Sequence, residues 1–167
     1  MVTSTGRTSC IGFFRRKVIQ ALPQLKPWMI DPAELLPVGA SLPWDRVFDS
    51  LPFGSDGLLP AVAQQYDTGE VLMLAWVNRA ALRETLATGH VCYWSRSRAR
   101  QWRKGETSGH AQHLREMRLG CDGDALLLLV EQTGPACHSG RTSCFYNAVC
   151  GDRVLVISSA LQRSGHD

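Results

Sequence analysis

Three cysteines in the second half of the chain could bind a metal ion. Cys121, Cys137 and Cys144 stand 16 and 7 residues apart. Thiolates are soft ligands that suit zinc. A structural zinc site usually has four protein ligands, often in closely spaced pairs, whereas a catalytic site keeps one position open for water. Three widely spaced cysteines therefore favour an open, catalytic site. Because the spacing is not a standard zinc pattern, ordinary buried thiols remain the alternative.

Two aspartates follow the first of these cysteines. Asp122 and Asp124 carry carboxylates, which are hard ligands that suit magnesium. The segment 119–146 could thus hold two different metals.

A cluster of positive charge precedes the cysteines, in a segment 94–109 that is expected to be a loop. Within nine residues it carries Arg96, Arg98, Arg100, Arg103 and Lys104. Guanidinium and ammonium groups bind phosphate strongly, and Thr107 and Ser108 add neutral donors. One interpretation is a loop that binds a phosphorylated ligand. The alternatives are a solvated basic loop, or an RNA-binding surface in which Trp94 and Trp102 stack on bases.

The segments around these candidates predict a sheet. The apolar runs 61–66 and 70–76 are joined by Asp67-Thr68-Gly69, which favours a tight turn and therefore a β-hairpin. An unbroken Leu-Val run indicates a buried strand over 125–131. The other expected strands cover 90–95, 111–119, 144–149 and 154–158. With some seven strands, the fold is expected to be sheet-dominated.

One helix is expected to pack on this sheet. Asn78 can accept a hydrogen bond from an early helical N–H, and Gly89 can end the helix in a left-handed conformation. Between them, one face carries Ala81, Leu82, Thr85 and Leu86. The pattern predicts an amphipathic helix of about 10 residues.

The first part of the chain is rich in proline. Six prolines between positions 23 and 52 remove backbone donors, so residues 1–42 are expected to form an arm and linker, with regular structure beginning near Gly57. Residues 1–30 hold five basic and no acidic residues, which is typical of an organelle-targeting segment and also of an unstructured arm. No secretory apolar core is recognisable, so we expect the cysteines to stay reduced or metal-bound in the cytoplasm.

The composition suits a soluble globular domain. The 167 residues are 44% hydrophobic and 20% charged, and a formal net charge of +3 is too small for a general nucleic-acid coat. The longest apolar run is far shorter than the ~20 residues that cross a bilayer. We therefore expect no membrane and no nucleic-acid partner. The candidate ligands suit a metal hydrolase of a phosphorylated small molecule, although the H-x-E and P-C-x-x-C motifs of nucleobase deaminases are missing.

Several longer motifs carry a resemblance to a known family. They are TGEVLMLAW, WSRSR, WRKGETSG, CDGDALLLLVEQ, GPACH and SCFY, and they follow one another within residues 44–149. This pattern resembles phosphoribosyl-AMP cyclohydrolase, an enzyme of L-histidine biosynthesis. The resemblance implies hydrolytic opening of the adenine ring of N1-(5-phosphoribosyl)-AMP between N1 and C6. It also implies a cyclohydrolase domain over 43–150 and a C-terminal strand and tail over 151–167. Because 18 residues follow Val149, we expect the monofunctional form.

The same resemblance implies the fold, the assembly and the metals. The fold is expected to be α+β, with a mixed sheet folded on itself into a pseudo-barrel and about one main helix. Two chains are expected to form an intertwined homodimer. The family's zinc site combines cysteines of both subunits, at the positions of Cys121, Cys137 and Cys144 here. Asp122 and Asp124 are expected to bind magnesium.

A water that attacks the adenine ring needs a base nearby. His138 is the first candidate and His110 the second, although either imidazole could be structural. The expected phosphate ligands are Arg96, Arg98, Arg103, Lys104, Thr107 and Ser108. The cysteines that match no ligand position are Cys10, Cys92 and Cys150. Two rival hypotheses are a relative that has lost activity and serves as a scaffold, and a zinc-stabilised RNA-binding module.

One position departs from the family pattern, in which an aspartate precedes the first zinc cysteine. Here that position is Gly120. In a strand, the side chains of residues 120, 122 and 124 would share one face. Water could then replace the missing carboxylate, since a magnesium site usually keeps several waters. We therefore expect an active enzyme with a weaker affinity for magnesium.

Overall fold

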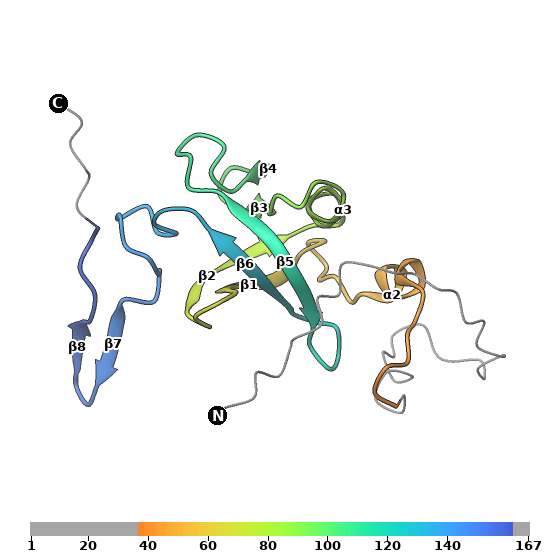
Figure 1. Ribbon diagram of the computed structural model, residues 1–167, viewed down its shortest axis with the longest axis horizontal. Coiled ribbons are helices and arrows are strands. Elements are labelled where there is room, and N and C mark those ends of the chain that lie inside the picture. Colours follow the sequence, from red (N-terminus) through yellow and green to blue (C-terminus); the bar gives the residue numbers. More distant parts are fainter. Residues whose placement is uncertain (1–36, 162–167) are drawn as a thin grey trace, which may run out of the picture.

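The computed structural model describes residues 37–161, and its centre is a six-stranded sheet with the order β4-β3-β2-β1-β6-β5 (Figure 1). Most of the expected N-terminal arm, with Cys10, and the end of the expected tail lie outside the described residues. In chain order the strands are β1 (Leu59–Gln65), β2 (Val71–Val77), β3 (Cys92–Ser95), β4 (Arg100–Arg103), β5 (Gln112–Leu119) and β6 (Leu126–Gln132).

The first two strands form the expected hairpin. They pair antiparallel, from Leu59 opposite Val77 to Gln64 opposite Val71. On its other side β1 pairs in parallel with β6, and β6 pairs antiparallel with β5. The sheet is therefore mixed, as expected.

The sheet also curls, because the chain just before β3 reaches across to β5. His90 and His113 form an isolated antiparallel bridge. Beside it, the Val91 N–H donates to the Gln112 carbonyl at 2.9 Å and the Leu114 N–H donates to the Gly89 carbonyl at 2.7 Å. The result is a curled half-barrel, so the expected α+β class and the folding of the sheet on itself are confirmed.

The expected helix is α3 (Arg79–Thr88). The Asn78 side chain accepts a hydrogen bond from the Ala81 N–H at 2.8 Å, and Gly89 ends the helix with φ 74°. Ala81, Leu82 and Thr85 are buried against the sheet, but Leu86 is 40% exposed. Its expected place on the buried face is wrong, because the line of contact runs through positions 81, 82 and 85 and leaves Leu86 at the rim.

A second helix, α2 (Trp44–Ser50), lies where regular structure was not expected. Phe48 is 4% exposed in the core, and the Arg79 guanidinium donates to the Phe48 carbonyl at 2.8 Å and so caps the end of the helix. The same guanidinium lies over the rings of Phe48 and Phe53. Regular structure therefore begins before Gly57, and long-range contacts hold it in place.

The segment 94–109 is also not simply a loop. It contains β4, which pairs antiparallel with β3 from Cys92 opposite Arg103 to Ser95 opposite Arg100. This strand sends successive basic side chains in different directions.

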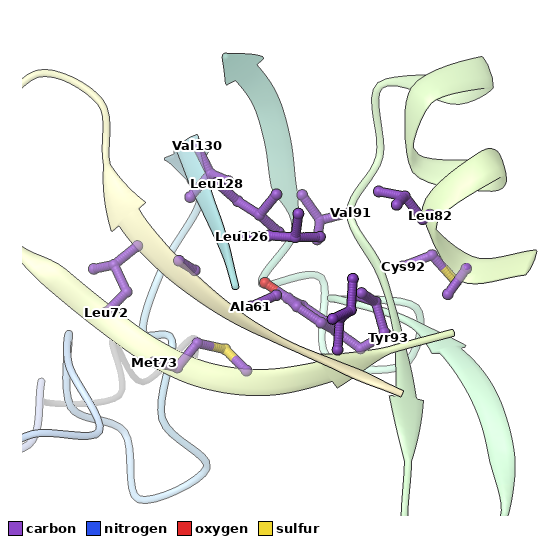
Figure 2. Packing of buried hydrophobic residues seen from close by; sticks show 14 of the residues in the cluster. Ala61, Leu72, Met73, Leu82, Val91, Cys92, Tyr93, Leu126, Leu128 and Val130 are labelled. Atoms are coloured by element: carbon purple, nitrogen blue, oxygen red, sulfur yellow. The ribbon is translucent and has the colours of Figure 1, made fainter. Parts of the chain in front are cut away.

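The hydrophobic core lies inside the curl of the sheet (Figure 2). The side chains of Leu126, Leu128 and Val130 are at most 1% exposed, which confirms β6 as a buried strand. Burying each such aliphatic side chain contributes roughly 1.5–3 kcal/mol. Tyr93 is also fully buried, with its ring among these apolar side chains.

A separate hairpin follows the sheet and stands apart from it (Figure 1). It consists of β7 (Asn147–Cys150) and β8 (Arg153–Val156), close to the two strands expected in this region. Its apolar side chains are largely exposed, with 77% for Val149, 64% for Val154 and 62% for Val156. Neither helix within residues 37–161 is long and apolar enough to cross a membrane.

Candidate active site

The loop after β6 brings two of the three candidate zinc cysteines together. A tight turn follows Cys137, in which the Cys137 N–H donates to the Arg141 carbonyl at 3.1 Å. The chain then attaches to β2, because the Ser143 hydroxyl donates to the Val71 carbonyl and the Cys144 N–H donates to the Leu72 carbonyl, both at 2.7 Å. As a result Cys137 and Cys144 lie close enough for each thiol to change the pKa of the other.

The two thiols differ in acidity. Burial raises the pKa of Cys137, but hydrogen bonds from Ser139, contact with Cys144 and the charge of Arg141 outweigh it, so its pKa lies below the ordinary value. Burial and the neighbouring Cys137 raise the pKa of Cys144 to about 11. The Cys137 thiolate thus disfavours ionisation of Cys144, and a cation between the two sulfur atoms would remove that repulsion. The pair is a donor set that fits a soft metal such as zinc.

Cys121 lies elsewhere. It belongs to the exposed turn between β5 and β6, whereas Cys137 follows the far end of β6 (Figure 1). A seven-residue strand spans roughly 20 Å, so one chain cannot place all three sulfur atoms around one ion. Across residues 37–161 no three His, Cys, Asp or Glu side chains converge closely enough to hold a metal.

A cavity of about 1170 Å³ opens beside the thiol pair. Among the sequence-predicted residues, those that line it are Arg98, Lys104, Ser108, His110, Cys137, His138 and Cys144. Both candidate bases, both paired thiols and half of the expected phosphate ligands therefore face one space. Its further lining includes Met73, Trp102 and Pro135, which offer apolar surface.

The other expected phosphate ligands do not line the cavity. The Arg96 guanidinium lies 4.7 Å from the centre of the Trp76 ring. Arg103 forms an ion pair with Glu84 of α3. Thr107 is exposed outside the cavity lining. Arg96 and Arg98 lie in the turn 96–99 between β3 and β4, whereas Arg103 lies in β4, so these cations reach different partners.

The Lys104 ammonium group lies close enough to the two thiols for them to affect its pKa. Burial lowers the pKa of its ammonium group, and the nearby Cys144 and Cys137 partly counteract that effect. Its backbone N–H donates to the Val91 carbonyl at 3.0 Å, which fixes the start of the loop 104–111. Lys104 can therefore interact with the thiol pair and can also bind an anionic ligand in the cavity.

Two glycines shape the loop that carries His110. A Cβ on Gly105, which has φ 87°, would lie 2.5 Å from the Ala111 nitrogen. A Cβ on Gly134, with φ 65°, would lie 2.7 Å from a carbon of the His110 ring. Both positions require glycine, since a side chain would displace the loop or the imidazole.

Some cavity residues were not predicted as site residues from the sequence. Met73 and Pro135 are ordinary apolar residues, while Ala160 and Leu161 lie beyond the motifs of the family. Ser139 was also missed, although its hydroxyl donates to the Cys137 sulfur at 3.1 Å. Its position two residues after the candidate ligand Cys137 could have suggested this contact from the sequence.

The aspartates lie in a turn and not in a strand. The Gly120 N–H donates to the Ala125 carbonyl at 2.9 Å, which closes a turn over Asp122 and Asp124. The expected alternation of residues 120, 122 and 124 on one strand face is therefore wrong, because β5 ends at Leu119. Both carboxylates remain exposed and close to Cys121 in sequence.

Known proteins resemble this chain over most of its length. The family model for phosphoribosyl-AMP cyclohydrolase matches residues 73–146. A phosphoribosyl-AMP cyclohydrolase of Halorhodospira halophila is 65% identical over 128 residues, which are 77% of this chain and 90% of the relative. The chain belongs to the phosphoribosyl-AMP cyclohydrolase family. A protein of Pseudomonas fluorescens named phosphoribosyl-AMP cyclohydrolase 2 is 63% identical over 134 residues, or 80% of this chain and 91% of the relative.

The part matched by the phosphoribosyl-AMP cyclohydrolase model contains most of the cavity. It runs from Met73 through the thiol pair to Tyr146. Ala160 and Leu161 lie outside it. The resemblance in sequence and the gathering of chemical groups in space thus fall on the same part of the chain.

Proposed function

We propose that the chain hydrolyses the adenine ring of N1-(5-phosphoribosyl)-AMP, a step of L-histidine biosynthesis. The observation that carries the proposal is the cavity, in which paired thiols, two imidazoles and cationic side chains face one space. Family membership supplies the substrate, because the relatives are named for it.

The cationic side of the cavity would hold the phosphates. Arg98 and Lys104 offer charged donors, and Ser108 adds a hydroxyl. These side chains bind the ends of the substrate and not its reacting ring, so they contribute mainly to binding. The apolar surface of Met73 and Trp102 suits the base.

Opening of the ring requires two proton transfers. Water adds to C6, and both of its protons leave the oxygen as the N1–C6 bond breaks. One ends on the exocyclic nitrogen and the other is matched by protonation of N1, which leaves a carboxamide at C6 and an N–H at N1. His138 is the base that takes the first proton, and His110 supplies the second to N1. Cys137 and Cys144 would hold zinc, which lowers the pKa of a bound water and so eases its deprotonation.

The third zinc ligand would come from a second copy of the chain. Cys121 lies at the opposite end of β6 from the thiol pair, so a shared site needs the turn of a partner. The exposed apolar side chains of the β7–β8 hairpin support such a homodimer, since a surface of this kind is usually covered.

Magnesium would be bound at the turn next to Cys121. Asp122 and Asp124 are exposed there and provide oxygen ligands, with waters and a substrate phosphate to complete the shell. In the homodimer this turn would lie beside the cavity of the partner.

The test is a direct assay of ring opening. We expect purified protein to change the absorbance of phosphoribosyl-AMP, a chelator to abolish the change, and zinc with magnesium to restore it. An inactive, zinc-loaded protein would favour the scaffold hypothesis. Salt-sensitive RNA binding without turnover would favour the RNA-binding module.

A further inference from the structure

A chain of hydrogen-bonded side chains connects the core to the loop that carries His110. The Tyr93 hydroxyl donates to Oε1 of Gln112 at 2.7 Å, and Nε2 of Gln112 donates to Oε1 of Gln132 at 2.8 Å. Nε2 of Gln132 then donates to the carbonyls of His110, at 3.3 Å, and Thr133, at 2.7 Å. We refer to Tyr93, Gln112 and Gln132 as the relay.

The contact with the His110 carbonyl fixes which atoms of the relay donate and which accept hydrogen bonds. Backbone carbonyls can only accept, so the Gln132 amide must present both N–H groups to His110 and Thr133. Its oxygen must then accept from Gln112, whose own oxygen is left to accept from Tyr93. Neither amide can flip without placing two oxygens against each other.

The other end of the relay is anchored in the core. Tyr93 and Gln112 are each 0% exposed. The Tyr93 ring lies among the buried apolar side chains (Figure 2) and 5.3 Å from the Trp102 ring, which lines the cavity. A buried glutamine that is hydrogen-bonded through both amide atoms has little freedom to move, because breaking its bonds leaves polar atoms without partners.

We propose that Gln132, held by Gln112, is a positioning residue that sets His110 in the cavity. The inference rests on the role of His110 in the proposed reaction. Gly134 lies against the imidazole, where a Cβ would come within 2.7 Å of a ring carbon, and the Gln132 amide holds the His110 backbone carbonyl. Gln112 and Gln132 thereby transmit the rigidity of the core to a group that must meet N1 of the substrate.

The test compares two variants of the full-length chain. Gln132→Glu keeps the shape of the side chain but sets an oxygen against the two carbonyls. Tyr93→Phe, the matched control, removes the far end of the relay and leaves the bonds to His110 and Thr133. The first readout is the NMR spectrum of ¹³C-labelled imidazoles, in which the His110 signal is identified by its loss in His110→Ala. The second is kcat with phosphoribosyl-AMP.

We expect Gln132→Glu to shift the His110 signal and to lower kcat roughly ten-fold. Tyr93→Phe should lower the melting temperature but leave the His110 signal in place and kcat within about two-fold. Because Gln132 acts through His110, the double variant Gln132→Glu/His110→Ala should be no slower than His110→Ala alone. If Gln132→Glu does not fold, Gln132→Met, which also lacks the donors, takes its place.

An unchanged His110 signal in the Gln132 variant would overturn the proposal. So would losses in kcat that multiply in the double variant, since they would show a role independent of His110. If the native protein has no turnover, the proposed function fails, and the NMR comparison alone decides whether the relay positions the imidazole.

Discussion

Arg96 and Arg98 are two residues apart, yet they make different contacts. Arg98 lines the cavity, whereas Arg96 lies over the Trp76 ring. Arg98→Ala should raise KM roughly ten-fold with little change in kcat, because a phosphate contact is made equally in ground and transition states. Steady-state kinetics of both alanine variants check this. Arg96→Ala is the control and should leave KM nearly unchanged; a larger effect at Arg96 would place the phosphates on the other side of β4.

Sequence could single out as candidates the residues with distinctive chemistry. Cys137, Cys144 and the two histidines lie together on one cavity. The apolar residues Met73 and Pro135 were not predicted, because an apolar side chain has the same character in a core as in a binding site. The residue type alone also could not separate Arg98 from Arg103, since the ion pair of Arg103 depends on where α3 packs.

Gly120 offers a second test at this scale. A Cβ at this position would lie 3.4 Å from Oδ1 of Asp124, so a new carboxylate would begin beside an existing one. Gly120→Asp should lower the magnesium concentration needed for half-maximal rate roughly ten-fold, because a further oxygen ligand replaces water. Magnesium titrations at fixed zinc measure it, with Asp122→Asn as a control that should raise the requirement. Superimposable curves for native and Gly120→Asp protein would show that position 120 supplies no ligand.

Among the elements, local signals predicted α3 and the β1–β2 hairpin well. Asn78 and Gly89 set the ends of the helix, and the turn residues 67–69 join the two strands. The helix α2 was missed because Arg79, far along the chain, caps it. The strand β4 was missed because arginines are usually solvated, and its pairing with β3 supplies what its composition lacks.

The loop between β4 and β5 gives a test at the scale of elements. Gly105→Ala should destabilise the protein by roughly 3–5 kcal/mol, because the new Cβ meets the backbone of Ala111 as well as a positive φ. Gly109→Ala has a similar φ of 72° but open space around its Cβ, and should cost only about 1–2 kcal/mol. Urea unfolding of both variants gives the comparison. Equal losses would mean that the packing of the loop against Ala111 contributes nothing.

At the scale of the whole molecule, the chain keeps its candidate zinc ligands apart. Cys137 and Cys144 share one loop, and Cys121 lies at the other end of β6. The β7–β8 hairpin exposes apolar side chains that a second copy could cover. Local sequence patterns could not predict this separation. It depends on the pairing of β5 with β6, which places the turn with Cys121 at one end of the hairpin and the loop with Cys137 and Cys144 at the other. The family resemblance supplied the expectation of a site shared between subunits.

Complementation between subunits shows whether two chains build each active site. Cys121→Ser and Cys137→Ser, each inactive alone, are co-expressed with different tags, and the heterodimer is purified through both. One of its two sites would then hold three native cysteines, so we predict about half of the wild-type rate with phosphoribosyl-AMP. A heterodimer of Cys137→Ser with Cys144→Ser, whose changes fall on the same loop, should stay inactive. No recovery in the first pair, or equal recovery in both, would contradict the shared site.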